Sequence, residues 1–256
     1  MMTADIIFWA LALLVAFLVG AAKGGLPLVG ILAVPLLSLV MPAGQAAGLT
    51  LPIYILSDIY GLWIYRREFD KRNLMILIPA GAIGIFAGYA TAHITNEDLV
   101  KFLVALIGLA YCADAVSKTW RVVPSKPADV PRGVFWGALA GFTSFVSHAG
   151  APPYNMFVLP QKLPKMIYAG TSTIVFAAIN LMKLPPYIAL GQVNFSSLQT
   201  CAVLAPMALF GAWAGYQLTK IVPEKLFFRA IELALLVVSV LLMRESILGV
   251  LGLFHT

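Results

Sequence analysis

The sequence predicts an all-α integral membrane protein of two inverted repeats, each a broken-helix hairpin followed by three transmembrane helices. Of its 256 residues, 61% are hydrophobic and 11% are charged, whereas soluble domains contain about 45–50% apolar and about 25% charged residues. Several uncharged runs approach or exceed the ~18 residues that mark a spanning helix, among them residues 6–22, 74–92 and 196–218. Short sequence patterns also recur in the same order in the two halves of the chain.

The expected helices follow the apolar runs. Their predicted ranges are 5–22, 28–41, 43–65, 74–93 and 97–117 in the first half and 133–147, 153–160, 164–184, 196–219 and 224–243 in the second. A polar, proline-containing stretch separates the two sets. It predicts a first membrane repeat at residues 1–117, a cytoplasmic linker at 118–132 and a second membrane repeat at 133–256.

The basic residues predict the orientation of the chain. Thirteen of the 17 Lys and Arg residues fall on the side of the linker, and such an excess marks the cytoplasmic side of a membrane. The opposite side is left with Lys101, Lys183 and Arg244. Counting crossings outward from the linker places both termini on the external side. The thirteen residues are Arg66, Arg67, Lys71, Arg72, Lys118, Arg121, Lys126, Arg132, Lys162, Lys165, Lys220, Lys225 and Arg229.

The net charge of +6 does not indicate nucleic-acid binding, because the basic residues form short clusters between apolar runs and no continuous basic face. Cys112 and Cys201 lie far apart, each inside an apolar run and without CxxC spacing. We therefore expect neither a cysteine-ligated metal nor a cofactor.

The internal repeat rests on two matches. The hexapeptide at residues 84–89 recurs at 211–216 with four of six positions identical, and residues 42–50 align with residues 164–172. The matches occur in the same order in each half. With five helical segments per half, the two halves must have opposite orientations in the membrane, an arrangement typical of secondary transporters. The glycines of the hexapeptides have small-xxx-small spacing, which predicts close helix packing.

Each half opens with a helix that glycine and proline interrupt, at residues 23–27 and 148–153. A helix that starts after such a break presents free N–H groups and a partial positive charge, which together favour an anion. Lys23 and His148 add a cationic or protonatable side chain at the equivalent place in each half. Surface turns, with Lys23 snorkelling to the interface, are the alternative. The residues predicted to line an anion site are Lys23, Gly24, Gly25, Thr50, His148, Gly150, Thr171 and Ser172.

Polar residues inside the apolar helices have either a functional or a structural role. Asp58 is a carboxylate in an apolar helix, where charge is expensive; it is either a coupling site for a proton or ion, or the structural partner of a basic neighbour. The repeat register pairs it with Asn180, which cannot titrate. The hydroxyls of Thr50, Thr171 and Ser172 either donate to a substrate oxygen or make hydrogen bonds between helices.

In this order, these motifs resemble the sulfite exporter TauE/SafE family of membrane permeases. The resemblance covers about residues 8–243 and is carried by four features: Gly24-Gly25 followed by Pro35, Ala47-Gly48-Leu49-Thr50, Gly170-Thr171-Ser172, and the two Gly-x-x-x-Gly helices. It implies transport of small sulfur-containing anions, such as sulfite, sulfoacetate or related organosulfonates, across the bacterial inner membrane. Members often carry a denser glycine run at the first break, so we expect Lys23 and His148 to tune the choice of substrate.

The sequence thus predicts a secondary transporter that exports such an anion by alternating access. A transporter or channel for another small anion or for a metal cation is the alternative, although the scarcity of buried carboxylates disfavours a cation path. An enzyme is not expected, because Ser147 and His148 are adjacent on a helix and point apart. The expected partners are the small anion and the lipid bilayer; a homodimer is left open.

Overall fold

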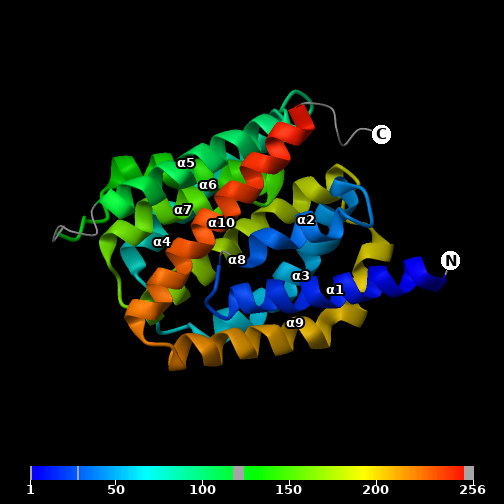
Figure 1. Cartoon of the computed structure of the whole chain (residues 1–256), viewed down its shortest axis with the longest axis horizontal. Helices are drawn as coiled ribbons and strands as arrows, with labels where there is room; N and C mark the ends of the chain where they lie inside the picture. The colour runs from blue at the N-terminus through cyan, green and yellow to red at the C-terminus, as the bar shows by residue number, and fades with distance from the viewer. Residues whose placement is uncertain (1, 28, 118–123, 251–256) are drawn as a thin grey trace. The chain divides into compact units, whose positions relative to one another are not determined.

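The computed structural model describes residues 2–27, 29–117 and 124–250, and the regular elements within these ranges are helices, with no strand (Figure 1). The all-α prediction is therefore confirmed for the described residues. The helices are α1 (Met2–Lys23), η1 (Val29–Leu32), α2 (Ala33–Leu37), α3 (Ala43–Ile64), α4 (Lys71–Ala90), α5 (Glu97–Ser117), α6 (Val130–Ser147), α7 (Ala151–Val158), η2 (Leu159–Gln161), α8 (Lys165–Ala189), α9 (Phe195–Ile221) and α10 (Glu224–Val250).

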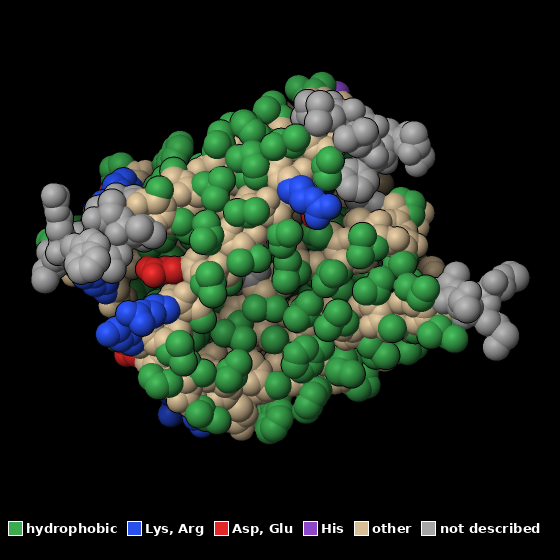
Figure 2. All heavy atoms as spheres, viewed as in Figure 1, with side chains coloured by type: hydrophobic (Ala, Val, Ile, Leu, Met, Phe, Trp, Pro, Cys, Tyr) green, Lys and Arg blue, Asp and Glu red, His purple; other side chains and the backbone are tan. Residues whose placement is uncertain are grey.

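Six of the described helices are long and apolar enough to cross a membrane: α1, α3, α4, α8, α9 and α10. Large hydrophobic side chains such as Phe86, Phe195 and Leu233 are exposed on them. Figure 2 shows a face covered largely by hydrophobic side chains, with few charged ones. A contiguous apolar surface of this kind needs lipid as its solvent. The chain is a multi-pass membrane protein.

Three predicted helix ranges are wrong in length. The last helix, α10, continues to Val250, beyond its expected end at residue 243. The segment at 28–41 is not one helix, since η1 is followed by the short α2, which ends at Leu37. The Tyr54 hydroxyl donates to the Gly30 carbonyl at 2.5 Å and holds this segment against α3. In contrast, α8 continues to Ala189, beyond the expected end at residue 184, with Pro185 and Pro186 inside it. Membrane helices tolerate proline because neighbouring groups satisfy the freed carbonyls.

The predicted linker lies only partly within the described residues, because residues 118–123 fall outside them. The backbone N–H of Lys126 donates to the Pro160 carbonyl at 3.0 Å. The Asp129 side chain then caps α6 by accepting from the backbone N–H of Arg132 at 3.1 Å. Since this cap fixes where α6 begins, the helix starts at Val130, inside the stretch predicted as linker.

The chain forms two compact units, and each draws on both halves of the sequence. Unit 1 comprises residues 1–70 and 165–224, and unit 2 comprises residues 71–164 and 225–256. The predicted division into repeats at residues 118–132 stays a prediction about the sequence, since neither unit coincides with one half.

In unit 1, α1 and α9 run side by side (Figure 1), and α3 packs against α1, α8 and α9. The contact between α1 and α9 is made by small residues. A Cβ atom on Gly20 would overlap the Ala208 carbonyl, and one on Gly215 would lie 2.9 Å from the Ala21 Cα. Such contacts let the two backbones approach closely.

In unit 2, the same kind of contact joins α4 to α6. A Cβ atom on Gly84 would overlap the Ala138 carbonyl, and one on Gly141 would overlap the Gly81 carbonyl. A reciprocal pair of side-chain amide bonds links Asn73 to Gln161 at 2.8 and 3.0 Å. The glycines of both predicted small-xxx-small helices therefore serve helix packing.

We expect Gly20→Ala to reduce the free energy of unfolding by about 1–3 kcal/mol, because its methyl group would meet the α9 backbone, which cannot easily move. Gly44→Ala is the matched control, since nothing lies within 4 Å of a Cβ at this position in α3. Unfolding in detergent measures both variants. Equal effects of the two substitutions would contradict the close approach of α1 and α9.

Candidate functional site

The first break is the C-terminal cap of α1. The backbone N–H of Gly24 donates to Gly20, that of Gly25 to Ala22 at 3.3 Å, and that of Leu26 to Ala21 at 3.3 Å. The last two bonds form a Schellman motif, with Gly25 at φ 122°. These amides point back into α1, so an oxyanion bound here would depend on side chains for its hydrogen bonds.

Two hydroxyl groups donate to the buried Gly24 carbonyl at this break. Tyr65 Oη donates to the Gly24 carbonyl at 2.7 Å, and Thr219 Oγ1 donates to it at 3.3 Å. Burial raises the pKa of the Tyr65 phenol above its ordinary value, which keeps the group a hydrogen-bond donor at neutral pH. Thr173 Oγ1 donates to the Lys23 carbonyl at 3.2 Å. The break is thus fastened to α3, α8 and α9.

Lys23 ends α1 and points into unit 1. Its Nζ lies 2.8 Å from Asp58 Oδ1 on α3, and both side chains are 5% exposed. Asn180 on α8 donates from Nδ2 to Asp58 Oδ2 at 2.9 Å. Lys23 therefore does not snorkel to a membrane interface. Its ion pair with Asp58 joins α1 to α3, and the hydrogen bond from the Asn180 amide joins α8 to α3.

Matched residues of the two sequence halves meet around Lys23. Asp58 and Asn180 are paired by the repeat register and hydrogen-bonded to each other. The same register pairs Tyr54 with Phe176, and their ring centroids lie 5.1 and 5.9 Å from Lys23 Nζ. Both rings are close enough for cation–π attraction, which is strengthened when the cation is desolvated.

Lys183 was not among the predicted site residues, because it was counted with the basic residues of the external side at the end of the predicted helix 164–184. Lys183 lies inside α8, one turn beyond Asn180, and is fully buried. Its Nζ is 5.2 Å from the Tyr187 ring centroid. The spacing of three residues from Asn180 is the signal that could have found it.

The buried interior of unit 1 contains three ionisable side chains. Among the residues that the structure describes there, the buried acidic and basic side chains are Lys23, Asp58 and Lys183. Ionisable residues inside membrane helices are rare and usually have a function. This cluster is therefore the candidate functional site of unit 1.

The three predicted hydroxyls belong to unit 1 and have local hydrogen-bond partners. Thr50 Oγ1 donates to the Ala47 carbonyl at 3.1 Å, and Ser172 Oγ donates to the Ala169 carbonyl at 2.9 Å, each within its own helix. Thr171 Oγ1 accepts from the backbone N–H of Asp70 at 2.8 Å. Their contact with a substrate stays a prediction.

The second break belongs to unit 2. His148 caps α6 in the left-handed conformation, with φ 53°, and its side chain is buried. Gly150 is the N-cap of α7. Because Pro152 and Pro153 have no N–H, the beginning of α7 presents fewer amide donors than an ordinary helix. His148 and Gly150 thus lie in a different unit from Lys23, and a site shared by both breaks stays a prediction.

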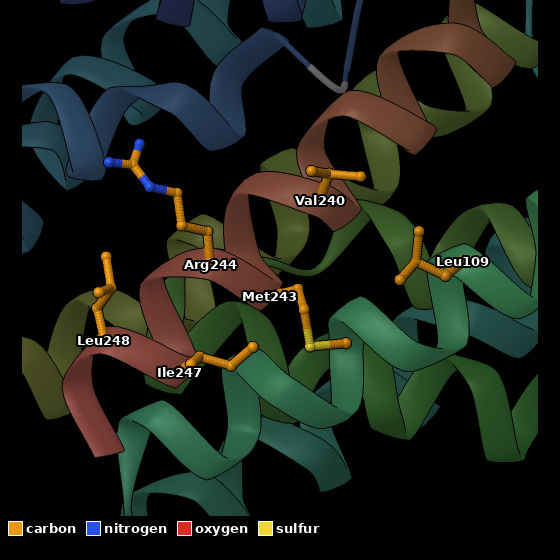
Figure 3. A pocket seen from close by; sticks show the side chains of 6 residues that line it. All are labelled: Leu109, Val240, Met243, Arg244, Ile247 and Leu248. Atoms are coloured by element: carbon orange, nitrogen blue, oxygen red, sulfur yellow. The ribbon is translucent and has the colours of Figure 1, made fainter. Parts of the chain in front are cut away.

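An open, largely apolar pocket lies on the surface between α5 and α10 in unit 2 (Figure 3). Arg244 is its charged residue, and in Figure 3 the guanidinium points away from Leu109 on α5. None of the predicted anion-site residues lines this pocket. Its composition matches the surrounding lipid-facing surface.

We expect Lys23→Met and Asp58→Asn each to destabilise the protein by about 3–5 kcal/mol, because either change leaves a buried charge without its partner. In the double variant, the decrease in the free energy of unfolding should be smaller than the sum of the two single decreases, by at least about 1 kcal/mol. Unfolding of the detergent-purified variants measures this double-mutant cycle.

The pair Lys101–Glu245 provides the matched control, with 3.8 Å between Nζ and Oε2 and side chains 18% and 33% exposed. A cycle of Lys101→Met and Glu245→Gln should show a coupling of about 0–1 kcal/mol. Additive effects at Lys23 and Asp58 would contradict a structural ion pair.

The resemblance seen in the sequence is confirmed by comparison with known proteins. The sequence model described as sulfite exporter TauE/SafE matches residues 10–243 of this chain. Neither a search of curated proteins nor one of solved structures gives a match. Since the family match covers nearly the whole chain, the protein belongs to the sulfite exporter TauE/SafE family, which implies a membrane transporter of sulfite or related anions.

Proposed function

We propose that this protein exports a small sulfur-containing anion, such as sulfite, sulfoacetate or a related organosulfonate, by alternating access. The observation that carries the proposal is the cluster of buried ionisable side chains in unit 1, Lys23, Asp58 and Lys183, in which Lys23 Nζ lies 2.8 Å from Asp58 Oδ1. Membership of the family supplies the class of substrate.

The chemistry of the cluster suits a sulfonate or sulfite group. Lysine ammonium groups are compact donors that hydrogen-bond an oxyanion from several directions. A sulfur oxyanion presents several oxygens around one centre, so it can accept from two ammonium groups at once. The rings of Tyr54 and Phe176 beside Lys23 keep water away, and a drier site strengthens each electrostatic contact.

We infer that the two sequence halves are inverted repeats. Asp58 and Asn180, which the repeat register pairs, are hydrogen-bonded at 2.9 Å. A further support is that α1 packs on α9 while α6 packs on α4. In both cases the first helix of one half meets the fourth helix of the other, so the two halves make matching helix contacts.

On this proposal, His148 remains a second basic residue predicted to bind the anion, and Asp58 is a candidate for coupling as well as the partner of Lys23. On this proposal the protein resides in the bacterial inner membrane, as the family resemblance implies, and the excess of Lys and Arg on the linker side supports an orientation with both termini outside. An anion that crosses alone from a negative interior gains about 2.3 kcal/mol per charge per 100 mV, which favours export.

We expect sulfite, sulfoacetate or methanesulfonate to raise the thermal unfolding midpoint of the detergent-purified protein, because a ligand that binds the folded state stabilises it by mass action. The anion-dependent rise should be lost or strongly reduced in Lys23→Ala and His148→Ala, each compared with its own anion-free sample. Lys225→Ala removes an exposed basic residue and is the matched control.

Two outcomes would contradict the proposal. An unchanged rise in both variants would exclude the site, whereas a rise with divalent metal chlorides that equimolar sodium chloride does not reproduce would favour the cation alternative. Proteoliposomes loaded with the binding anion then test transport itself. Release should depend on the protein and fall in the two variants.

A further inference from the structure

The pocket between α5 and α10 lies where these two helices of unit 2 run side by side. A Cβ atom on Gly249 would meet the Asp98 carboxylate, and one on Gly108 would meet the Ser239 hydroxyl. Residue numbers rise along α5 while those of their neighbours fall along α10, so the two helices are antiparallel. The walls of the pocket are therefore held by helix packing within one unit.

One face of α10 forms most of the pocket wall. Its lining residues follow the i, i+3, i+4, i+7, i+8 spacing of a single helix face, and Leu109 from α5 completes the lining (Figure 3). The pocket has a volume of about 420 Å³, within the range of about 300–1,000 Å³ that is typical of ligand pockets. The lining residues on α10 are Val240, Met243, Arg244, Ile247 and Leu248.

The pocket opens toward lipid. Val240 and Ile247 in its wall are 52% and 46% exposed, and α10 is one of the described helices that are long and apolar enough to cross a membrane. Leu103 and Leu106 are exposed on α5. An apolar groove on such a surface is filled by a lipid acyl chain, because water and polar solutes gain nothing by entering it. The apolar wall alone does not distinguish one lipid from another.

Arg244 interrupts the apolar stripe of α10. Its side chain is exposed, and within unit 2 no described residue forms an ion pair or a hydrogen bond with its guanidinium. The neighbouring carboxylate of Glu245 lies 3.8 Å from Lys101 Nζ on α5. In Figure 3 the guanidinium points away from Leu109. Because an arginine keeps its charge and a charge beside lipid is costly, we expect an anion from the surroundings of unit 2 to balance it.

The position of Arg244 along α10 places it near a membrane surface. Arg229 and Arg244 are 15 residues apart on this helix, which is about 22 Å along the axis at ~1.5 Å per residue. The hydrocarbon core is about 30 Å thick, so Arg244 lies within about 8 Å of one boundary when Arg229 lies at the other. A long basic side chain extends from such a position to the headgroups, where the concentrated anions are lipid phosphates.

We propose that the pocket between α5 and α10 binds an anionic phospholipid, with one acyl chain along the apolar stripe and the phosphate at the Arg244 guanidinium. The guanidinium is a planar fork of donors that matches two phosphate oxygens. Pockets between transmembrane helices that contain basic residues are suited to anionic lipid headgroups. The cluster of Lys23 and Asp58 belongs to unit 1, so this inference does not depend on which anion is transported.

The test uses the full-length protein in detergent micelles that contain a trace of phosphatidylglycerol with a photoreactive diazirine in one acyl chain. After irradiation, mass spectrometry of the digested protein identifies the labelled residues. We expect the label to concentrate on Leu109, Met243 and Ile247. Unlabelled phosphatidylglycerol should compete about fivefold more strongly than phosphatidylcholine with the same chains, because its headgroup carries a net negative charge for the guanidinium to bind.

Arg244→Gln should remove this preference, so that the two lipids compete equally, whereas Arg244→Lys should retain most of it. Arg229→Gln is the matched control, since it removes an exposed arginine from the same helix outside the pocket, and it should match the native chain. Equal competition by the two lipids in the native chain overturns the inference. An unchanged preference in Arg244→Gln overturns it as well.

Three further results on the native chain would overturn the inference. A label spread evenly over the exposed residues of several helices would show ordinary contact with bulk lipid. Competition by glycerophosphoglycerol, the same headgroup without acyl chains, as strong as that of the intact lipid would assign the site to a free anion. A chain that elutes as a dimer and carries no label in the pocket would assign the groove to a second copy. Elution volume and helix content show whether each variant retains the native structure.

Discussion

A charge buried among apolar helices needs a partner within a few ångströms, and this requirement organises unit 1. Lys23 ends α1, Asp58 lies within α3, and Asn180 lies within α8, so satisfying the carboxylate draws three helices to one point. The Schellman cap at Gly25 ends α1 where its last side chain reaches Asp58. The break in the first helix thus positions the Lys23 side chain. The backbone N–H groups at the break donate to carbonyls of α1 and complete its C-terminal cap.

The packing of the helices explains why spatial units and sequence halves differ. Small residues such as Gly20 and Gly84 bring α1 onto α9 and α4 onto α6. Each of these contacts joins a helix of one half to a helix of the other. In lipid no hydrophobic driving force separates one pairing from another, so close backbone contact decides which helices associate. The chain therefore folds into units that interleave its halves.

The sequence alone predicted the membrane helices, because an apolar run that crosses a lipid bilayer must satisfy its backbone hydrogen bonds internally and therefore forms a helix. Asp58 and Asn180 were paired by register alone, and the structure joins them. Lys183 was not recognised because it lay at the end of the predicted helix 164–184 and was counted as an external basic residue, whereas α8 continues past two prolines, which a membrane helix tolerates. The direction of the amides at Gly24 and Gly25 depends on a left-handed backbone turn, which residue types suggest but do not fix.

Stability alone does not account for the charged cluster. Apolar side chains of similar volume in place of a buried ion pair often leave a protein equally stable or more stable. Three ionisable groups, two of them cationic, would therefore be an inefficient way to hold α1, α3 and α8 together. On the proposed function, an anion bound beside these residues gives the basic groups a role that helix association alone does not require. The arrangement of Lys23, Asp58 and Lys183 would then reflect the charge of the proposed substrate as well as the packing of α1, α3 and α8.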